Sequence, residues 1–317
     1  MEVRKRKSNQ RRHLFIRTSC AIWQGCGTDF GNEDERESRP TGQPGVTVPA
    51  SERPVALTIA GFDPSAGAGV TADLKVFAAH DLYGVAAITA LTVQSTQGVR
   101  RLHAVSAGFL AETLECLAED AKISGVKIGM LGTAGVVSVV SQFLTNSGIP
   151  RDRIVLDPVV RSSSGRSLLN LAGLDLLRGE LLALVGWVTP NLDELAELAG
   201  CEVSGRQSIL AAARELALAH PGLNIVVTGG HLDPPDDFLL EADGAEQWFH
   251  GERIESRATH GTGCTFSSAL LAQLVTGSPP AEAVARAKQY VRAAMEAAYP
   301  VGKGQGPLNH LYRLDGI

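Results

Sequence analysis

Short apolar runs alternate with longer amphipathic stretches from residue 54 onward. Most of these runs lack polar alternation, as expected for strands that are covered on both faces. Strands are predicted over 55–60, 84–93, 126–131, 153–160, 186–189 and 224–228. Helices are predicted over 68–79, 106–121, 133–145, 192–199, 207–219, 262–275 and 280–298. This alternation favours an α/β fold of three αβα layers, with a mostly parallel central sheet and helices on both faces.

A hairpin is predicted where the segments 238–242 and 246–250 flank Asp243-Gly244. Several other predicted strands are followed by segments rich in glycine and polar residues. Ligands of parallel sheets bind beyond the carboxyl ends of the strands. We therefore expect the functional residues in these segments.

The first fifty residues differ in composition from the rest of the chain. Seven basic residues and one acid, Glu2, occur among the first seventeen, and a polar stretch containing glycine and proline follows. We expect 1–50 to be a basic extension that is disordered or lies upstream of the true start. An organelle transit segment stays open as a third interpretation, and 51–317 is expected to form one folded domain.

Charge and cysteine content exclude some classes of protein. The net charge is −5, which argues against a nucleic-acid partner because such domains usually have a basic face. The five cysteines are odd in number and form no Cys-x-x-Cys pair, which argues against a disulfide scaffold or a structural zinc site. No apolar run approaches the ~18 residues that span a bilayer. We expect a cytoplasmic protein without a membrane partner.

Residues 61–69 form a glycine-containing loop after the first predicted strand. Positions 67–72 read Gly-Ala-Gly-Val-Thr-Ala and match the dinucleotide fingerprint, but no acid lies between Asp81 and Glu112, where the fingerprint needs one. We interpret the match as coincidental and keep an NAD-dependent oxidoreductase as a rival hypothesis. The loop either brings its backbone close to a small ligand or is only a flexible turn.

Asp73 and Gln94 are candidate contacts for a small polar ligand. Asp73 lies early in a predicted helix, where a carboxylate either stabilises the helix dipole or accepts hydrogen bonds from an amine or hydroxyl. Gln94 ends the second predicted strand and offers both a donor and an acceptor, which suits an aminopyrimidine edge. A merely polar strand end explains Gln94 equally well.

Asn191 and Glu194 are spaced as a capping box, and capping is the first interpretation from the residues alone. The same pair could hold magnesium-bound waters near ATP phosphates, because Mg²⁺ prefers oxygen ligands.

Residues 259–265, Thr-His-Gly-Thr-Gly-Cys-Thr, precede a clearly predicted helix. Small residues let successive amides converge at a helix start, which makes an anion hole for a transferring phosphoryl group. Cys264 lies in the first turn, where we expect a lowered thiol pKa and a thiolate able to accept a hydroxyl proton. A structural turn with a small buried cysteine is the alternative. We interpret His260 as a hydrogen-bonding loop residue.

Two further glycine loops, 228–231 and 302–307, either line a nucleotide pocket or are only turns. No Gly-Lys-Ser/Thr sequence occurs in the chain, so a Walker A loop is absent.

Taken together, these segments resemble the hydroxymethylpyrimidine/phosphomethylpyrimidine kinases of thiamine biosynthesis, a branch of the ribokinase-like family. The similarity extends from about Val55 to Leu314. The segments that carry it are 56–61, the loop to Gly69, 72–75, 88–94, 127–131, 156–159, 189–192, 228–231, 259–265 and 302–304. The resemblance implies a ribokinase-like kinase domain that uses MgATP to phosphorylate 4-amino-5-hydroxymethyl-2-methylpyrimidine, and then its monophosphate to the diphosphate.

The resemblance also implies residue roles. Cys264 would be the catalytic base, and Gly261, Thr262 and Gly263 would stabilise the phosphoryl group. Pyrimidine contacts would come from Gln94, Asp73, Gly61, Met130 and Val159. Thr228, Lys303, Asn191 and Glu194 would contact ATP, and Asp157 and Glu194 would organise Mg²⁺, directly or through water. A homodimer is the oligomer that the resemblance favours.

Two residues depart from the family pattern. Phe62 occupies a position that is usually a small Ser or Thr, and Ala66 replaces a usual Gly. A bulky Phe62 beside the pyrimidine pocket would narrow or reshape it. Beside the NAD-dependent oxidoreductase, two further rival functions stay open: a pyridoxal kinase on the same fold, and a non-catalytic sensor that binds pyrimidine.

Overall fold

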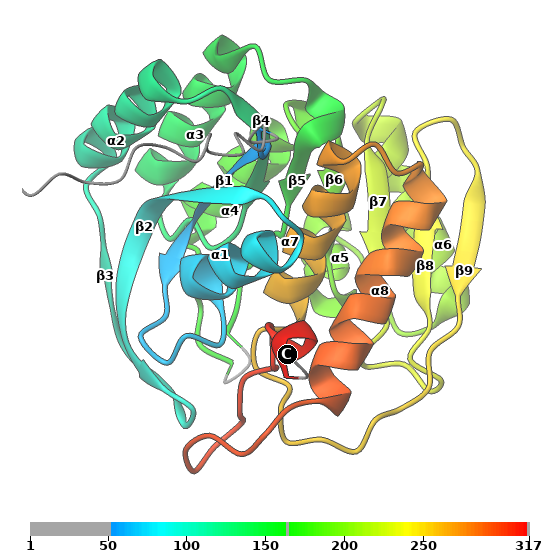
Figure 1. The fold of residues 1–317 in the computed structure, drawn as a ribbon. Coiled ribbons are helices and arrows are strands. Elements are labelled where there is room, and N and C mark those ends of the chain that lie inside the picture. Colours follow the sequence, from blue (N-terminus) through cyan, green and yellow to red (C-terminus); the bar gives the residue numbers. More distant parts are fainter. Residues whose placement is uncertain (1–51, 163–164, 316–317) are drawn as a thin grey trace, which may run out of the picture. The chain divides into compact units, whose positions relative to one another are not determined.

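The computed structural model describes residues 52–162 and 165–315, so the prediction for 1–50 lies outside the described residues. Nine strands of the described part form one sheet in the order β3-β2-β1-β4-β5-β6-β7-β8-β9 (Figure 1). The strands are β1 (Val55–Phe62), β2 (Tyr83–Ser95), β3 (Gly98–Ala104), β4 (Ile123–Ile128), β5 (Ile154–Leu156), β6 (Trp187–Val188), β7 (Asn224–Val227), β8 (Asp237–Leu240) and β9 (Glu246–Phe249).

The sheet is parallel from β2 to β7 and antiparallel at both edges. β1 pairs in parallel with both β2 and β4, whereas β3 pairs antiparallel with β2. At the other edge, β8 and β9 form the predicted hairpin. The chain leaves β1 first toward β2 and later toward β4, and such a reversal opens a crevice at the carboxyl ends of the strands.

Helices cover both faces of the sheet, as predicted. In Figure 1, α1, α7 and α8 lie in front of the sheet, and α2 to α6 lie behind it. The helices are α1 (Gly69–Ala79), α2 (Ala107–Asp120), α3 (Ala134–Ser147), α4 (Leu171–Gly179), α5 (Leu192–Ala199), α6 (Arg206–Ala219), α7 (Thr262–Val275) and α8 (Pro280–Glu296). None of the helices in the described ranges is long and apolar enough to cross a membrane.

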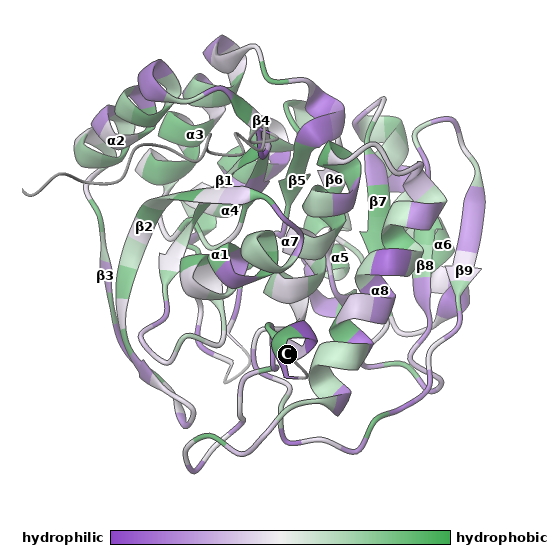
Figure 2. Ribbon diagram, in the orientation of Figure 1, coloured by the Kyte–Doolittle hydropathy of each residue, from purple (hydrophilic) through white to green (hydrophobic). Residues whose placement is uncertain are grey.

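Two hydrophobic cores lie on opposite faces of the sheet, because side chains alternate along a strand. In β5, Ile154 and Leu156 pack into the core shared with α2 to α6, and Val155 packs into the core shared with α1, α7 and α8. The central strands are mainly green in Figure 2, whereas β9 at the edge is largely purple. Strands buried on both sides explain the nearly continuous apolar runs in the sequence.

Most predicted elements are present, and the bounds predicted for α7 agree with the structure. Two elements were not predicted: the edge strand β3 and the short helix α4. The prediction for 153–160 was too long, because only Ile154–Leu156 is strand. The chain leaves the sheet at Asp157 and continues along the wall of a cavity.

Candidate active site

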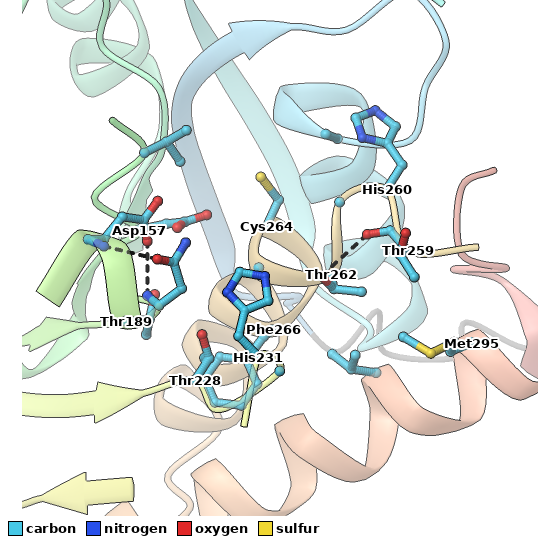
Figure 3. Close-up of a pocket in the computed structure, with 18 of the residues that line it drawn as sticks. Asp157, Thr189, Thr228, His231, Thr259, His260, Thr262, Cys264, Phe266 and Met295 are labelled. Carbon is cyan, nitrogen blue, oxygen red and sulfur yellow. Dashed lines mark hydrogen bonds between the residues drawn. The ribbon is translucent and has the colours of Figure 1, made fainter. Parts of the chain in front are cut away.

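A cavity of about 1180 Å³ lies at the carboxyl ends of the parallel strands. Its wall includes residues at or just after the ends of β1, β4, β5, β6 and β7, in that order Gly61, Met130, Asp157, Thr189 and Thr228. The beginning of α7 contributes the segment from Thr259 to Cys264. Figure 3 shows Cys264 at the start of this helix, with Asp157 and Thr189 to one side and Thr259 and Thr262 to the other. The cavity therefore occupies the position where parallel sheets bind ligands.

The first turn of α7 faces the cavity with backbone amides. Gly261 precedes the helix with φ of 84°, a left-handed conformation that favours glycine, and a Cβ there would collide with the carbonyl oxygen of Gly67. A glycine cap offers no side chain to the first amides of the helix, so these donors stay available to an anion. Thr262 and Gly263 line the cavity beside them. An anion hole at this helix start stays a prediction.

Cys264 is half-buried at the cavity wall, and its predicted ionisation is wrong. Burial raises the pKa of the thiol to about 12, and the carboxylates of Asp157 and Asp73 act in the same direction. The ammonium of Lys127 and a hydrogen bond from the backbone of Gly69 oppose this effect only in part. The helix start alone does not overcome desolvation and two nearby negative charges. Cys264 is therefore a neutral thiol at neutral pH in this state of the protein.

A buried ionic cluster lies directly behind Cys264. Lys127, on β4, has no solvent exposure, and its Nζ lies 3.1 Å from both carboxylate oxygens of Asp73 and 3.8 Å from Oδ2 of Asp157. The Asp73 carboxylate also accepts hydrogen bonds from Thr58 at 2.6 Å and Ser268 at 2.8 Å. The cluster thereby connects β1, α1, β4, β5 and α7.

The structure does not bring Asp73 to the cavity, contrary to the pyrimidine contact that the resemblance implied. Its side chain is completely buried, and both of its oxygens are occupied by Lys127 and two hydroxyl groups. Position 73 lies one turn inside α1, on the side that packs against α7 and the sheet. Asp73 therefore neutralises Lys127.

Lys127 was missed as a functional residue. The signal was present in the sequence, because a lysine within the apolar segment 126–131 needs a buried countercharge. The countercharges, Asp73 and Asp157, hold the pKa of Lys127 above its ordinary value despite complete burial. Lys127 therefore stays charged, and the carboxylates of Asp73 and Asp157 balance its charge behind the cavity wall.

Asn191 and Glu194 form the capping box that the residues alone suggested. The backbone amide of Glu194 donates to Asn191 Oδ1 at 2.9 Å, and the amide of Asn191 donates to Glu194 Oε2 at 3.0 Å. Both residues also line the cavity, as does Asp157. Burial, followed by the charge of Asp157, raises the pKa of Glu194 to about 8.

Asp157 and Glu194 are the candidate metal ligands. Burial also raises the pKa of Asp157, against the opposing charge of Lys127. Two nearby carboxyl groups whose ionisation is unfavourable fit a cation between them, and oxygen is the ligand atom that Mg²⁺ prefers. No group of three or more His, Cys, Asp or Glu suited to a metal ion occurs in the described ranges. The protein would supply at most a few of the ligands of such an ion.

Three predicted pyrimidine contacts line the cavity together. A Cβ on Gly61 would overlap the methyl group of Met130, so the absent side chain creates the space that Met130 occupies. Val159 follows β5, and Phe62 lies beside Gly61 on the same wall. Phe62, the bulky residue that departs from the family pattern, therefore borders the proposed pocket for the pyrimidine ring.

Gln94 is half-buried at the end of β2 and lines the same cavity as Cys264. Nε2 of His260 lies 3.1 Å from the Gln94 Nε2 position and 2.7 Å from Oδ2 of Asp63. Burial opposes ionisation of Asp63, yet hydrogen bonds from His260 and Ser65 hold its pKa below the ordinary value. His260 is thus a hydrogen-bonding residue, as predicted, and Asp63 is a partner that was missed.

Of the four predicted ATP contacts, Asn191 and Glu194 are described above, and the other two, Thr228 and Lys303, behave differently. Thr228 follows β7 and lines the cavity. Lys303 is exposed and does not line it, because its loop packs onto another residue: the amide of Gly304 donates to Thr96 Oγ1 at 3.2 Å. A role for Lys303 in binding ATP has no support from this arrangement.

Comparison with known sequences identifies the family. Residues 63–309 match the family model described as phosphomethylpyrimidine kinase. The hydroxymethylpyrimidine/phosphomethylpyrimidine kinase of Haemophilus influenzae is 39% identical over 260 residues, covering 80% of this chain and 95% of that protein. The thiamine biosynthesis bifunctional protein ThiED of Geobacter sulfurreducens is 39% identical over 262 residues, and the match covers 82% of this chain but 53% of that protein. The chain thus spans about half the length of the bifunctional relative.

Solved structures agree with the fold. The phosphomethylpyrimidine kinase from Clostridium difficile is 31% identical with a TM-score of 0.67, covering 76% of this chain and 98% of that one. The pyridoxal kinase from Staphylococcus aureus, solved with AMP-PCP and pyridoxal, is 27% identical with a TM-score of 0.74, covering 83% of this chain and 96% of that one. The ribokinase-like architecture expected from the sequence is confirmed. With its family match across most of the described residues, the chain belongs to the phosphomethylpyrimidine kinase family.

Proposed function

We propose that this chain transfers the γ-phosphoryl group of ATP to 4-amino-5-hydroxymethyl-2-methylpyrimidine, and then phosphorylates the monophosphate to the diphosphate, in thiamine biosynthesis. The observation that carries this proposal is the shared cavity of Gln94 and Cys264. A ring that contacts Gln94 can extend its hydroxymethyl group toward the start of α7. The names of the relatives agree with this substrate.

Recognition of the ring rests on one polar side chain and several apolar contacts. Gln94 offers a donor and an acceptor to the aminopyrimidine edge. Gly61, Met130 and Val159 provide a surface for the ring faces. Such a division, with apolar walls and few polar groups, is typical of small-molecule sites.

Phosphoryl transfer depends mainly on positioning and on charge stabilisation. The backbone amides of Gly261 to Cys264 donate hydrogen bonds to the phosphoryl oxygens and thereby stabilise the charge that develops on them. Thr228 and Asn191 line the nucleotide side of the cavity.

Cys264 serves as the base in this proposal, although its thiol is neutral before substrates bind. Asp157 raises the pKa of Cys264, so neutralising the charge of Asp157 would lower it. A bound Mg²⁺ held by Asp157 and Glu194 would neutralise this charge and that of the phosphates. In the substrate complex the Cys264 thiol would first release its own proton to solvent, and the thiolate would then accept the proton of the substrate hydroxyl group as that oxygen bonds to phosphorus and ADP leaves.

Pyridoxal kinase is the second candidate function. It is favoured by the TM-score of 0.74 to the pyridoxal kinase from Staphylococcus aureus, compared with 0.67 to the phosphomethylpyrimidine kinase from Clostridium difficile. Both substrates present a hydroxymethyl group on a six-membered nitrogen ring. They differ in that only the pyrimidine receives a second phosphate.

Mass spectrometry of products tests both candidates. The full chain is incubated with ATP and Mg²⁺, and with either hydroxymethylpyrimidine or pyridoxal. Two added phosphates on the pyrimidine are the expected result. Phosphorylation of pyridoxal alone would contradict the proposal. Cys264→Ala should lower kcat more than it affects the pyrimidine KM, whereas Gln94→Ala should mainly raise KM.

We also propose that the chain forms a homodimer through β2. Leu91 and Val93 are 46% and 47% exposed, and being two residues apart they lie on one face of the strand. An exposed apolar pair on a sheet surface fits contact with a second copy. Light scattering of Leu91→Glu/Val93→Glu should give the monomer mass if this is the interface.

A further inference from the structure

Asp63 determines that Nε2 of His260 carries a hydrogen. Oδ2 of Asp63 lies 2.7 Å from His260 Nε2, and Asp63 is 4% exposed. The carboxyl group has a lowered pKa and is therefore an ionised, acceptor-only partner. Nε2 of His260 must consequently carry a hydrogen and donate it toward Asp63.

This hydrogen constrains Gln94. A protonated Nε2 cannot accept a hydrogen bond, so the Gln94 atom that lies 3.1 Å away must be an acceptor. The oxygen and nitrogen of a carboxamide have nearly the same shape, and the hydrogen-bond network decides which occupies each position. The carboxamide oxygen therefore faces His260, and the two acceptors Asp63 and Gln94 share the Nε2 hydrogen.

Thr92 accommodates the same orientation from the other side when its hydroxyl group donates to Phe62. Its hydroxyl group donates to the carbonyl oxygen of Phe62 at 3.0 Å and has no second hydrogen to donate. The other polar atom of the Gln94 amide lies 3.2 Å from Thr92 Oγ1. A nitrogen at this place donates to the hydroxyl oxygen and satisfies both groups, whereas an oxygen would leave the contact without a hydrogen.

The imidazole of His260 is held rigidly in this position. A Cβ on Gly67 would collide with the ring, so the absent side chain lets the loop pack against it. The backbone amide of His260 donates to the carbonyl oxygen of Gly306 at 3.1 Å. Asp63 is fixed as well, because it accepts from the backbone amides of Ser65 at 2.8 Å and Ala68 at 3.0 Å.

We propose that Asp63 and His260 are positioning residues that fix the orientation of the Gln94 amide, and thereby the order in which the cavity presents its donor and acceptor to the substrate ring. Rotating the amide by half a turn would exchange the two groups. The aminopyrimidine edge, which pairs an amine donor with a ring-nitrogen acceptor, would then meet like groups. The identity of this ring rests on the proposed function, but the orientation of the amide does not.

The first test needs no substrate. ¹⁵N NMR of the full chain, assigned with His260→Gln, reports which ring nitrogens carry hydrogens. A hydrogen on Nε2 of His260 in the wild type is expected, and a lower occupancy of this position is expected in Asp63→Leu, which has no acceptor. A neutral ring with hydrogen only on Nδ1 would overturn the proposal.

The second test is a double-mutant cycle in substrate kinetics. His260→Ala should raise the KM for hydroxymethylpyrimidine about tenfold, the factor that corresponds to about 1.4 kcal/mol, and should change kcat much less. In the Gln94→Ala background the same substitution should change KM by less than about twofold. Equal factors in the two backgrounds would show that His260 acts independently of Gln94 and would overturn the proposal.

Two variants separate positioning from general damage to the fold. His260→Gln retains an N–H near the place of Nε2. Its KM should therefore lie between that of the wild type and that of His260→Ala. His103→Gln, at an exposed histidine on β3, is the matched control and should leave both parameters unchanged. If the wild type does not phosphorylate the pyrimidine, the proposed function fails, and the NMR result alone decides on the hydrogen bond.

Discussion

The ammonium group of Lys127 lies 3.1 Å from the carboxylate of Asp73, and neither side chain is exposed to solvent. The two residues are 54 positions apart in the sequence and come from the strand β4 and the helix α1. Their pairing fixes α1 against the sheet. The carboxylate of Asp157 is the third charged group and lies 3.8 Å from the same ammonium group.

Lys127→Met should destabilise the protein strongly. The substitution leaves the carboxylates of Asp73 and Asp157 buried without their cation, and breaking a buried pair in this way typically costs about 3 to 5 kcal/mol. Urea unfolding measures the loss. The matched control is Arg292→Met, which removes an exposed partner of Glu296 and should cost about 1 kcal/mol or less. A similar small loss in both variants would contradict the prediction.

Cys264 should react slowly with iodoacetamide at neutral pH. Only the thiolate is nucleophilic, and burial raises the pKa of this thiol to about 12. Cys116 and Cys201 are exposed and serve as internal controls. We expect modification of Cys264 to be roughly 1000-fold slower than that of an ordinary thiol, because a pKa about three units above 9.0 lowers the thiolate fraction by that factor. Peptide mass spectrometry gives all three rates, and a Cys264 rate equal to the controls would refute this ionisation state.

Glu194→Gln should change how stability depends on pH. The folded pKa of Glu194, about 8, lies above the ordinary value of 4.5, so the folded state binds the extra proton between these values. Stability of the wild type therefore falls as pH rises from about 5 to 8, and one pKa unit corresponds to about 1.4 kcal/mol. The variant lacks this titration and should gain stability relative to the wild type over this range.

Urea unfolding at pH 5, 6, 7 and 8, as approximate settings spanning these pKa values, provides the measurement for Glu194. Glu215→Gln, at an exposed glutamate of α6, is the control and should keep the same offset from the wild type at each pH. A constant offset for Glu194→Gln as well would show that the carboxyl group is not perturbed.

Ala66→Gly should stabilise the protein. Ala66 has a φ of 57°, in the left-handed region that costs a side-chain-bearing residue about 1 to 2 kcal/mol. Glycine removes this strain but loses entropy on folding, so a net gain of about 1 kcal/mol or less is expected. Ala211→Gly, in the exposed interior of α6, should have the opposite sign, a loss of about 1 kcal/mol. Thermal unfolding distinguishes the two, and a loss in both variants would contradict the prediction.

The parts of the fold that follow from hydrophobic pattern were predictable. The strand segments β1, β4 and β7 are buried on both faces and read as apolar runs. β3 could not be found in this way, because Arg100, Arg101 and His103 face solvent on an edge strand that only its pairing with β2 defines. α4 has nine residues and includes two glycines, which gives little helical signal.

The candidate site was predictable where a residue acts through its place after a strand or before a helix. Gln94, Thr228 and Cys264 are of this kind, and all three line the cavity. The direction in which Asp73 points depends on Lys127, which a different strand supplies, and the pKa of Cys264 depends on burial. Both quantities arise from tertiary packing and are not contained in a local motif.

Gly261 and Gly67 meet where no side chain fits between their backbones. Because of this contact, the loop of residues 61–69 and the turn before α7 cannot move apart or together independently without a clash or a gap between their backbones. A change of substrate preference would then come from apolar residues of the cavity wall, such as Phe62 or Met130. A side chain at Gly261 or Gly67 would displace both segments together.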